Sequence, residues 1–229
     1  MMSPRETFER ELKDLRDEVV KMGLMVSSQV DTAWRSFATM DTELAKQVIE
    51  MDHAVNTARF TIEDLCFKLI VTQQPAARDL RNIMGAVNLI IDLERIGDKA
   101  KDIANTIPSI LKAPNRRRPT ELMEMAPLVR QMLDLCIQAY GSETTELLQQ
   151  IADQDKELDR LFIEVVNQTI EDFAKATKEK KVTATFGILR AAQHLERIGD
   201  LVTNVAERIM YVSTGSVQEI KTHQRDSVD

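Results

Sequence analysis

Glycine and proline, the two strongest breakers of regular secondary structure, are scarce in this sequence. There are 7 glycines and 6 prolines among 229 residues, about half their share in an average soluble protein. Aromatic residues make up only 4%, so the β-branched and aromatic runs between glycine-rich turns that characterise sandwiches and barrels are missing. These absences exclude an all-β fold and favour long helices.

Cysteines, long apolar runs and excess positive charge are also missing or few. The two cysteines, Cys66 and Cys136, stand singly in apolar helical patterns; we expect buried free thiols in a reducing cytoplasm, with a disulfide as the alternative. No apolar run approaches the roughly 18 to 20 residues that span a bilayer. With 30 Lys and Arg against 37 Asp and Glu, the net charge of −7 argues against nucleic acid as the main partner.

One hexapeptide, Leu-Glu-Arg-Ile-Gly-Asp, occurs twice, at Leu93–Asp98 and at Leu195–Asp200. An offset of 102 residues aligns residues 86–107 with 188–209 and gives eight identities in 22 positions. Upstream, an offset of 103 aligns Asp52 with Asp155. The chain therefore contains two copies of one unit.

Apolar residues follow a helical period in six long segments, three in each copy. The segments cover residues 5–38, 41–73, 77–112, 120–140, 144–178 and 182–212, with Asp41 and Ser142 as candidate N-caps. We predict an all-α fold of two tandem, structurally similar three-helix bundles. The expected first bundle is 1–113, the linker with two prolines and three arginines is 114–119, the second bundle is 120–212, and 213–229 is a mobile tail.

The helix that carries each hexapeptide has an apolar stripe on one face and a row of oxygen-bearing side chains opposite it. The rows are Glu94, Asp98, Asp102 and Asn105 in the first copy, and Glu196, Asp200, Asn204 and Glu207 in the second. Like charges at this spacing repel one another, so a compensating cation is expected.

The compensating positive charge has two candidate sources: basic side chains in salt bridges, and bound metal ions. In the first copy, salt bridges are available from Arg95, Lys99 and Lys101. In the second copy, the corresponding segment holds uncharged residues, so its acidic row is less neutralised; these residues are Leu201, Val202 and Thr203. This difference favours bound metal ions.

A glycine, Gly97 or Gly199, lies just off the apolar stripe of each of these helices. Because a glycine inside a helix costs about 1 kcal/mol relative to alanine, we expect another helix to approach closely there. If that helix is the second of the unit, it adds Asp52 and Asn56 in the first copy and Asp155 and Asp159 in the second. Such oxygen ligands suit Fe, Mn, Mg or Zn.

Other functions remain open from the residues alone. A metal-dependent hydrolase or oxidase would use the same carboxylates, but the Glu-x-x-His of di-iron bundles occurs once, at Glu50 and His53. No nucleophile motif or glycine-rich phosphate loop accompanies it. A plain helical scaffold with acidic, solvated faces is the third alternative.

Further motifs surround the hexapeptides. They are Gln74-Pro-Ala-Ala-Arg-Asp-Leu-Arg81, and an N-terminal Phe8-x-x-Glu-Leu-x-x-Leu-Arg followed by Met22-Gly. Together with both hexapeptides, they closely resemble the PhoU family of bacterial phosphate-uptake regulators, and the resemblance spans residues 5–212.

This resemblance implies a six-helix protein that binds multinuclear metal clusters through Glu94 and Asp98 in one copy and Glu196 and Asp200 in the other. It implies no catalysis. The expected role is negative regulation, as a cytoplasmic adaptor between the ATPase subunit of the phosphate ABC transporter and the sensor histidine kinase of the phosphate-starvation response. Such proteins lie peripheral to the inner membrane through their partners, and many are homodimers.

Overall fold

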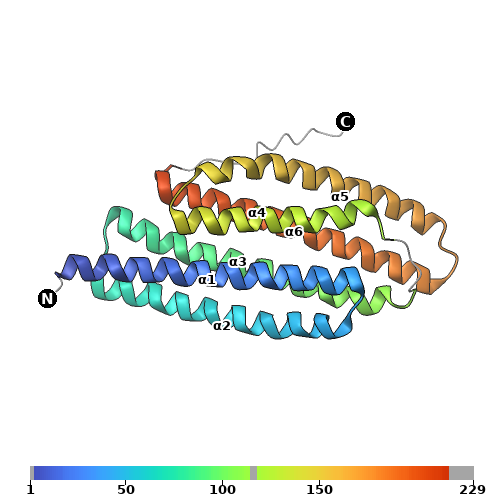
Figure 1. The fold of residues 1–229 in the computed structure, drawn as a ribbon, viewed down its shortest axis with the longest axis horizontal. Helices are drawn as coiled ribbons and strands as arrows, with labels where there is room; N and C mark the ends of the chain where they lie inside the picture. Colours follow the sequence, from blue (N-terminus) through green and yellow to red (C-terminus); the bar gives the residue numbers. More distant parts are fainter. Residues whose placement is uncertain (1–2, 114–117, 217–229) are drawn as a thin grey trace.

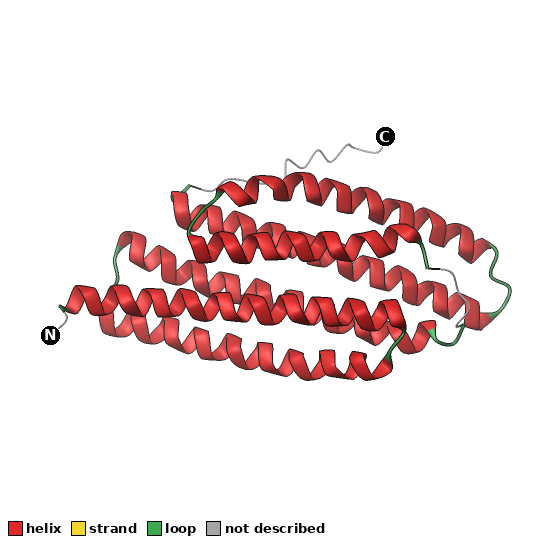
Figure 2. Cartoon of the chain, viewed as in Figure 1, coloured by secondary structure: helices red, strands yellow, loops and turns green. Residues whose placement is uncertain are grey.

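The computed structural model describes residues 3–113 and 118–216, and within these ranges it contains helices and no strand (Figure 2). Its elements are α1 (Pro4–Thr39), α2 (Thr42–Gln73), α3 (Ala77–Ile110), α4 (Thr120–Ser142), the short 3₁₀ helix η1 (Glu146–Gln150), α5 (Ile151–Ala174) and α6 (Glu179–Thr214). The all-α prediction with three long helices per copy is therefore confirmed. Within the described ranges, every helix is too short or too polar to span a membrane.

Local sequence explains where the first helices begin and end. Ser3 forms a capping box with Glu6, and the Asp41 carboxylate accepts hydrogen bonds from the backbone N–H groups of Glu43 and Leu44. Left-handed residues, Met40 and Gln74, close α1 and α2. These caps satisfy backbone groups that the helix ends would otherwise leave unpaired.

The second copy departs from the predicted boundaries. Ser142 is not an N-cap; it is the last residue of α4, and its hydroxyl donates to the carbonyl of Gln138. The single helix predicted over 144–178 is divided into the 3₁₀ helix η1 and a shorter α5, and Thr145, which precedes η1, makes no side-chain cap hydrogen bond.

Two predicted boundary segments lie largely outside the described residues. Of the expected linker, residues 114–117 are not described, while Arg118 donates two hydrogen bonds to the last carbonyls of α1, those of Phe37 and Ala38. Of the expected tail, Ser213 and Thr214 belong to α6 and residues 217–229 are not described.

The six long helices run roughly along one axis (Figure 1). Helices α1, α2 and α3 pack together, as do α4, α5 and α6, and the two groups meet where α3 packs on α6 and α1 on α4. Helices α2 and α5 therefore lie on opposite outer sides of the molecule (Figure 1).

Equivalent residues make the same contact twice between α3 and α6. A Cβ added to Gly85 would lie 2.2 Å from Cγ2 of Val212, and one added to Gly187 would lie 2.8 Å from Cγ1 of Ile110. The offset of 102 residues relates Gly85 to Gly187 and Ile110 to Val212. An exchange of roles of this kind is what a two-fold relation produces, so the two copies face each other through α3 and α6 over one continuous apolar core.

Candidate metal centres

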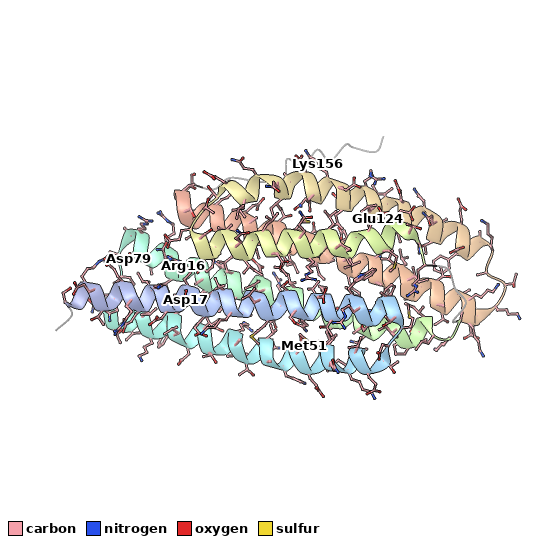
Figure 3. All side chains as sticks on the ribbon, viewed as in Figure 1. Arg16, Asp17, Met51, Asp79, Glu124 and Lys156 are labelled. Carbon is pink, nitrogen blue, oxygen red and sulfur yellow. The ribbon has the colours of Figure 1, made fainter. Side chains whose placement is uncertain are left out.

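The two acidic rows lie on α3 and α6, beside the outer helices α2 and α5. Figure 3 labels the chain neighbours of the two buried aspartates: Met51 precedes Asp52 on α2, and Lys156 follows Asp155 on α5. Both aspartates are 4% exposed. Asp52 contacts Lys101 of α3, and Asp155 contacts Thr203 of α6, so a carboxylate from the second helix of each copy lies against the hexapeptide helix.

In the first copy, the ammonium group of Lys101 joins the two helices. Its Nζ lies 2.7 Å from Oδ2 of Asp52 and 2.6 Å from Oδ1 of Asp98. Burial opposes the charged form of Lys101, but these hydrogen bonds outweigh it and raise the pKa of Lys101 to about 12. A positive charge thus bridges a carboxylate of α2 and one of α3.

Glu94 completes the acidic group of the first copy. Burial and the nearby charge of Asp98 raise the pKa of Glu94, while the cations Arg59 and Lys101 partly offset this increase. Arg59, on α2, was not expected here from the sequence, because nothing in its own segment marks it as a partner of a residue 35 positions away.

The C-terminal end of the acidic row on α3 lies near the second copy. Asp102 pairs with Lys99 at 2.8 Å, and its Oδ2 lies 3.7 Å from Nδ1 of His194 on α6. Asn105 is exposed. The predicted row is thus divided: Asp52 and Asp98 pair with Lys101, and Asp102 lies near the interface between copies.

In the second copy, a hydroxyl takes the place of the ammonium. The Thr203 hydroxyl lies 3.2 Å from Oδ1 of Asp155 and 3.1 Å from the carbonyl oxygen of Gly199, and its single proton is shared between these two acceptors. Arg197 of the same helix, whose side chain is 68% exposed, lies 3.2 Å from Asp200 and 3.9 Å from Glu196. Asp155, Glu196 and Asp200 therefore correspond to the three acidic residues of the first copy.

Three further predicted ligands lie on the outer surface of this copy. Asp159 and Asn204 are exposed and Glu207 is half-buried, so their membership of the site rests on helical spacing. Among the described residues, no three His, Cys, Asp or Glu side chains converge closely enough to hold an ion in this conformation.

The two hexapeptide glycines are close-approach positions, as predicted. A Cβ on Gly199 would lie 2.2 Å from Cδ2 of Leu158 on α5, whereas one on Gly97 would lie 2.7 Å from Oε1 of Gln29 on α1. In the first copy both α1 and α2 approach this glycine, since the added Cβ would also lie 3.6 Å from Cγ1 of Val55 on α2. Gln29 is fully buried and donates hydrogen bonds to the carbonyls of Val48 and Gly97. In the sequence, only its position as a single amide within an apolar stripe marks Gln29 as a buried polar residue.

The donor set suits a hard or borderline cation. The six central acidic residues offer only carboxylate oxygens, which hard cations prefer, and they stand on helices that pack on each other. In the first copy, Oδ1 of the buried Asp52 has no hydrogen-bond partner, and the ammonium of Lys101 already sits between two of the carboxylates. The chemistry of these side chains therefore suits positive charge, which Lys101 supplies in the first copy.

Comparison with known proteins identifies the family. A sequence model of the PhoU domain matches residues 19–107 and 122–209. The chain is 32% identical to the phosphate-specific transport system accessory protein PhoU homolog of Pseudomonas aeruginosa, over 92% of this chain and 87% of that protein. The corresponding homolog of Clostridium acetobutylicum is 31% identical, over 92% and 96%.

Solved structures agree with the sequence matches. The crystal structure of PhoU from Pseudomonas aeruginosa superposes with a TM-score of 0.85 at 30% identity, covering 91% of this chain and all of that one. The structure of the phosphate transport system regulatory protein PhoU from Streptococcus pneumoniae gives 0.84 at 26% identity, covering 92% and 99%. Because both repeated halves match the same domain and the relatives match along nearly the whole chain, this protein belongs to the PhoU family.

Proposed function

We propose that this chain is a non-enzymatic negative regulator of phosphate uptake and of phosphate-starvation signalling. The observation that carries the proposal is the match of both copies to the PhoU domain, together with relatives named accessory proteins of the phosphate-specific transport system. In this role, the chain links the ATPase subunit of the transporter to the sensor histidine kinase from the cytoplasmic side of the inner membrane. Its free, buried cysteines suit a reducing compartment.

Deletion of the gene tests the regulatory role. In phosphate-rich medium, a phosphate-starvation reporter should rise in the deletion strain and return to its low level when the wild-type gene is restored. Reporter output that stays low after deletion would refute negative regulation.

Metal binding is the second part of the proposal. Candidate ligands are Asp52, Glu94, Asp98 and Asp102 in the first copy, and Asp155, Asp159, Glu196, Asp200, Asn204 and Glu207 in the second. A bound Fe, Mn, Mg or Zn ion would neutralise the carboxylates and link α2 to α3 or α5 to α6. The clustering of buried Asp52 and Asp155 against the hexapeptide helices supports this role.

Elemental analysis of protein purified without chelator tests metal binding. We expect stoichiometric metal in the wild type and its loss in the double variant Asp98→Asn, Asp200→Asn. Asp14→Asn, on the exposed face of α1, is the control and should keep the metal. Metal-free wild-type protein whose thermal stability does not change on addition of Mn²⁺ or Fe²⁺ would contradict the proposal.

The structure gives little support to the alternative that this protein is a metal-dependent hydrolase or oxidase. Glu50 and His53 are exposed on α2. Burial raises the pKa of the Cys66 thiol to about 12 and raises the pKa of the Cys136 thiol as well, so neither is a ready nucleophile. Turnover of phosphate esters or consumption of oxygen by the metal-loaded protein would revive this alternative.

Exposed apolar residues support partner binding. They recur at four pairs of equivalent positions: Phe60 and Ile163, Phe67 and Ile170, Leu80 and Val182, and Met84 and Phe186. Single exposed apolar side chains are common, but the same four positions in both copies indicate a shared surface on the two hairpins α2–α3 and α5–α6. We assign this surface to the ATPase subunit.

Co-purification tests this assignment. The double variant Phe60→Ser, Phe67→Ser should capture less of the tagged ATPase subunit than the wild type does. Leu24→Ser, a change of an equally exposed residue on α1, should leave capture unchanged. Equal capture by all three proteins would exclude this surface of the first copy.

A homodimer remains part of the proposal. Sedimentation equilibrium of the full chain tests it, with a mass of twice 26.0 kDa expected.

A further inference from the structure

A cavity of about 130 Å³ lies between the two copies, at the end of the molecule where α3 begins. Its wall is formed by α1 and α3 of the first copy and by α4 and α6 of the second. A second hollow of about 280 Å³ shares Arg16, Arg78 and Asn82 with this cavity and extends along α1 as far as Arg5. The two connected hollows are large enough to admit a small polyatomic ion together with water.

Two motifs identified in the sequence meet at this cavity. The N-terminal motif that starts at Phe8 contributes Leu12, Leu15 and Arg16, and the motif at 74–81 contributes Arg78. Figure 3 labels Arg16 of the first motif and its neighbour across the hollow from the second motif, at the end of the molecule where α3 begins. Neither motif belongs to the acidic rows, so the functions proposed above leave both of them unexplained.

Four basic side chains line the connected hollows, and two of them are paired. Arg5 forms ion pairs with Glu9 and Asp79, and Arg16 forms one with Glu143. Among the described residues, these three carboxylates are all the acidic groups that line the hollows. Each negative charge at the cavity is therefore already neutralised by the protein.

The other two basic side chains, Lys13 and Arg78, have no ion-pair or hydrogen-bond partner among residues 3–113 and 118–216. Both are exposed, and both offer only hydrogen-bond donors. Arg78 stands in the first turn of α3, whose N-cap Ala76 makes no side-chain hydrogen bond, so the positive end of this helix adds to the local charge. In a chain with a net charge of −7, the unpaired charge at this cavity is positive.

Uncharged donors complete the wall. The side chains of Asn82, Tyr140 and Ser213 line the cavity and form no hydrogen bond within the described part of the chain. Burial raises the pKa of the Tyr140 hydroxyl, and Arg16 only partly offsets this increase, so the hydroxyl keeps its proton at neutral pH and remains a donor. These donors come from α3, α4 and α6, and an anion between the helices meets them from different sides.

We propose that this cavity binds an oxyanion of the phosphate type. Arg78 and Asn82, which line both hollows, are its central ligands, with Tyr140 on one side and Lys13 on the other. Arginine suits this ligand because its planar guanidinium donates to two phosphate oxygens at once. The chemistry recognised is the phosphate group, either as inorganic phosphate or as the end of a small monoester. This inference goes beyond the regulatory role and the metal binding proposed above and depends on neither.

Isothermal titration calorimetry of the full-length protein with inorganic phosphate tests the site. The wild type should bind one phosphate per chain, and Arg78→Gln should weaken binding by about 10- to 100-fold because a charge-assisted hydrogen bond is lost. Tyr140→Phe, which removes only a hydroxyl, should weaken it by about 2- to 10-fold. Lys180→Gln is the matched control, because the offset of 102 residues relates Lys180 to Arg78 and Lys180 is exposed on α6; it should leave the affinity unchanged.

Competing ligands identify the chemistry. Sulfate, a tetrahedral oxyanion, should displace phosphate, whereas acetate at the same concentration should not. Glycerol 3-phosphate distinguishes the two sources of the phosphate group: weaker binding than that of inorganic phosphate assigns the site to the free ion, and tighter binding assigns it to a monoester. Displacement by acetate as effective as that by sulfate would overturn the assignment to phosphate.

The variants separate a built site from general attraction of anions to basic side chains. Absence of phosphate binding by the folded wild type would overturn the proposal, as would an affinity that Arg78→Gln leaves unchanged. Equal losses with Arg78→Gln and Lys180→Gln would show diffuse surface attraction and would overturn it too. Circular dichroism establishes that the variants are folded, and Tyr140→Phe tests the cavity without any change of charge. Because the titration uses neither metal nor the starvation reporter, its failure leaves the proposed function intact.

Discussion

At the scale of single residues, buried polar groups mark the positions where the two copies differ. Asp52 and Asp155 are equally buried, but one pairs with an ammonium and the other with a hydroxyl. The acidic residues were predictable because they recur at fixed spacing. Their partners were not, since Lys101 contacts Asp52 across 49 positions of the chain.

His194 gives a residue-scale prediction about pH. Burial lowers the pKa of His194; Lys99 and Arg190 lower it further, and Asp102 partly offsets them. The folded protein therefore holds His194 neutral, and below about pH 6.5 the unfolded chain binds an additional proton at this residue. His194 should thus make the protein lose stability as pH falls through this range.

Thermal unfolding in the presence of chelator measures this effect. Between about pH 7.5 and 5.5, the wild type should lose more Tm than His194→Gln does. The same pH dependence in both proteins would show that His194 protonates equally in the folded and unfolded states.

At the scale of elements, the apolar periodicity of the sequence predicted the long helices, but it did not predict where some of them begin and end. Asp41 caps α2 as predicted, while Ser142 ends α4 and caps nothing. Both residues are typical N-cap types, and only the path of the chain after Ser142 distinguishes them. At Ser142 the chain enters a left-handed residue, Glu143, and then η1, so the next helix starts later than its residues suggest.

Alanine substitutions at these two positions should separate a cap from a residue that only resembles one. Asp41→Ala should cost about 1 kcal/mol of unfolding free energy because two backbone N–H groups lose their acceptor. Ser142→Ala, at an exposed position that bonds one carbonyl of its own helix, should cost only a few tenths of a kcal/mol. Urea unfolding measures both, and equal losses would contradict the assignment.

At the scale of the whole molecule, α3 and α6 hold the two copies together. Asp92 of α3, with 3% of its side chain exposed, accepts a hydrogen bond from Nε of Arg208 on α6 at 2.8 Å. Arg95, on the same helix as Asp92, is more distant at 3.6 Å and is 62% exposed. The buried carboxylate therefore depends on a cation from the other copy.

Removal of that cation should destabilise the whole chain. Arg208→Met should cost about 1–3 kcal/mol because it leaves a buried acceptor without its partner. Arg95→Met, which removes the exposed and more distant cation, should cost less than about 1 kcal/mol. Urea denaturation gives both values; a larger loss for Arg95→Met would mean that the contact within α3 supports Asp92.

The six helices, the internal repeat and the spacing of the acidic rows follow from the amino-acid sequence alone, because periodicity and repeats are properties of the order of residues along the chain. It also contained the hexapeptide glycines, which the structure confirms as close-approach positions. The packing of the helices determines that Lys101 joins Asp52 to Asp98, that Gln29 of α1 lies against Gly97, and that α3 and α6 exchange equivalent contacts. These features depend on side chains that are distant in sequence and meet only when packed helices bring them within a few ångströms.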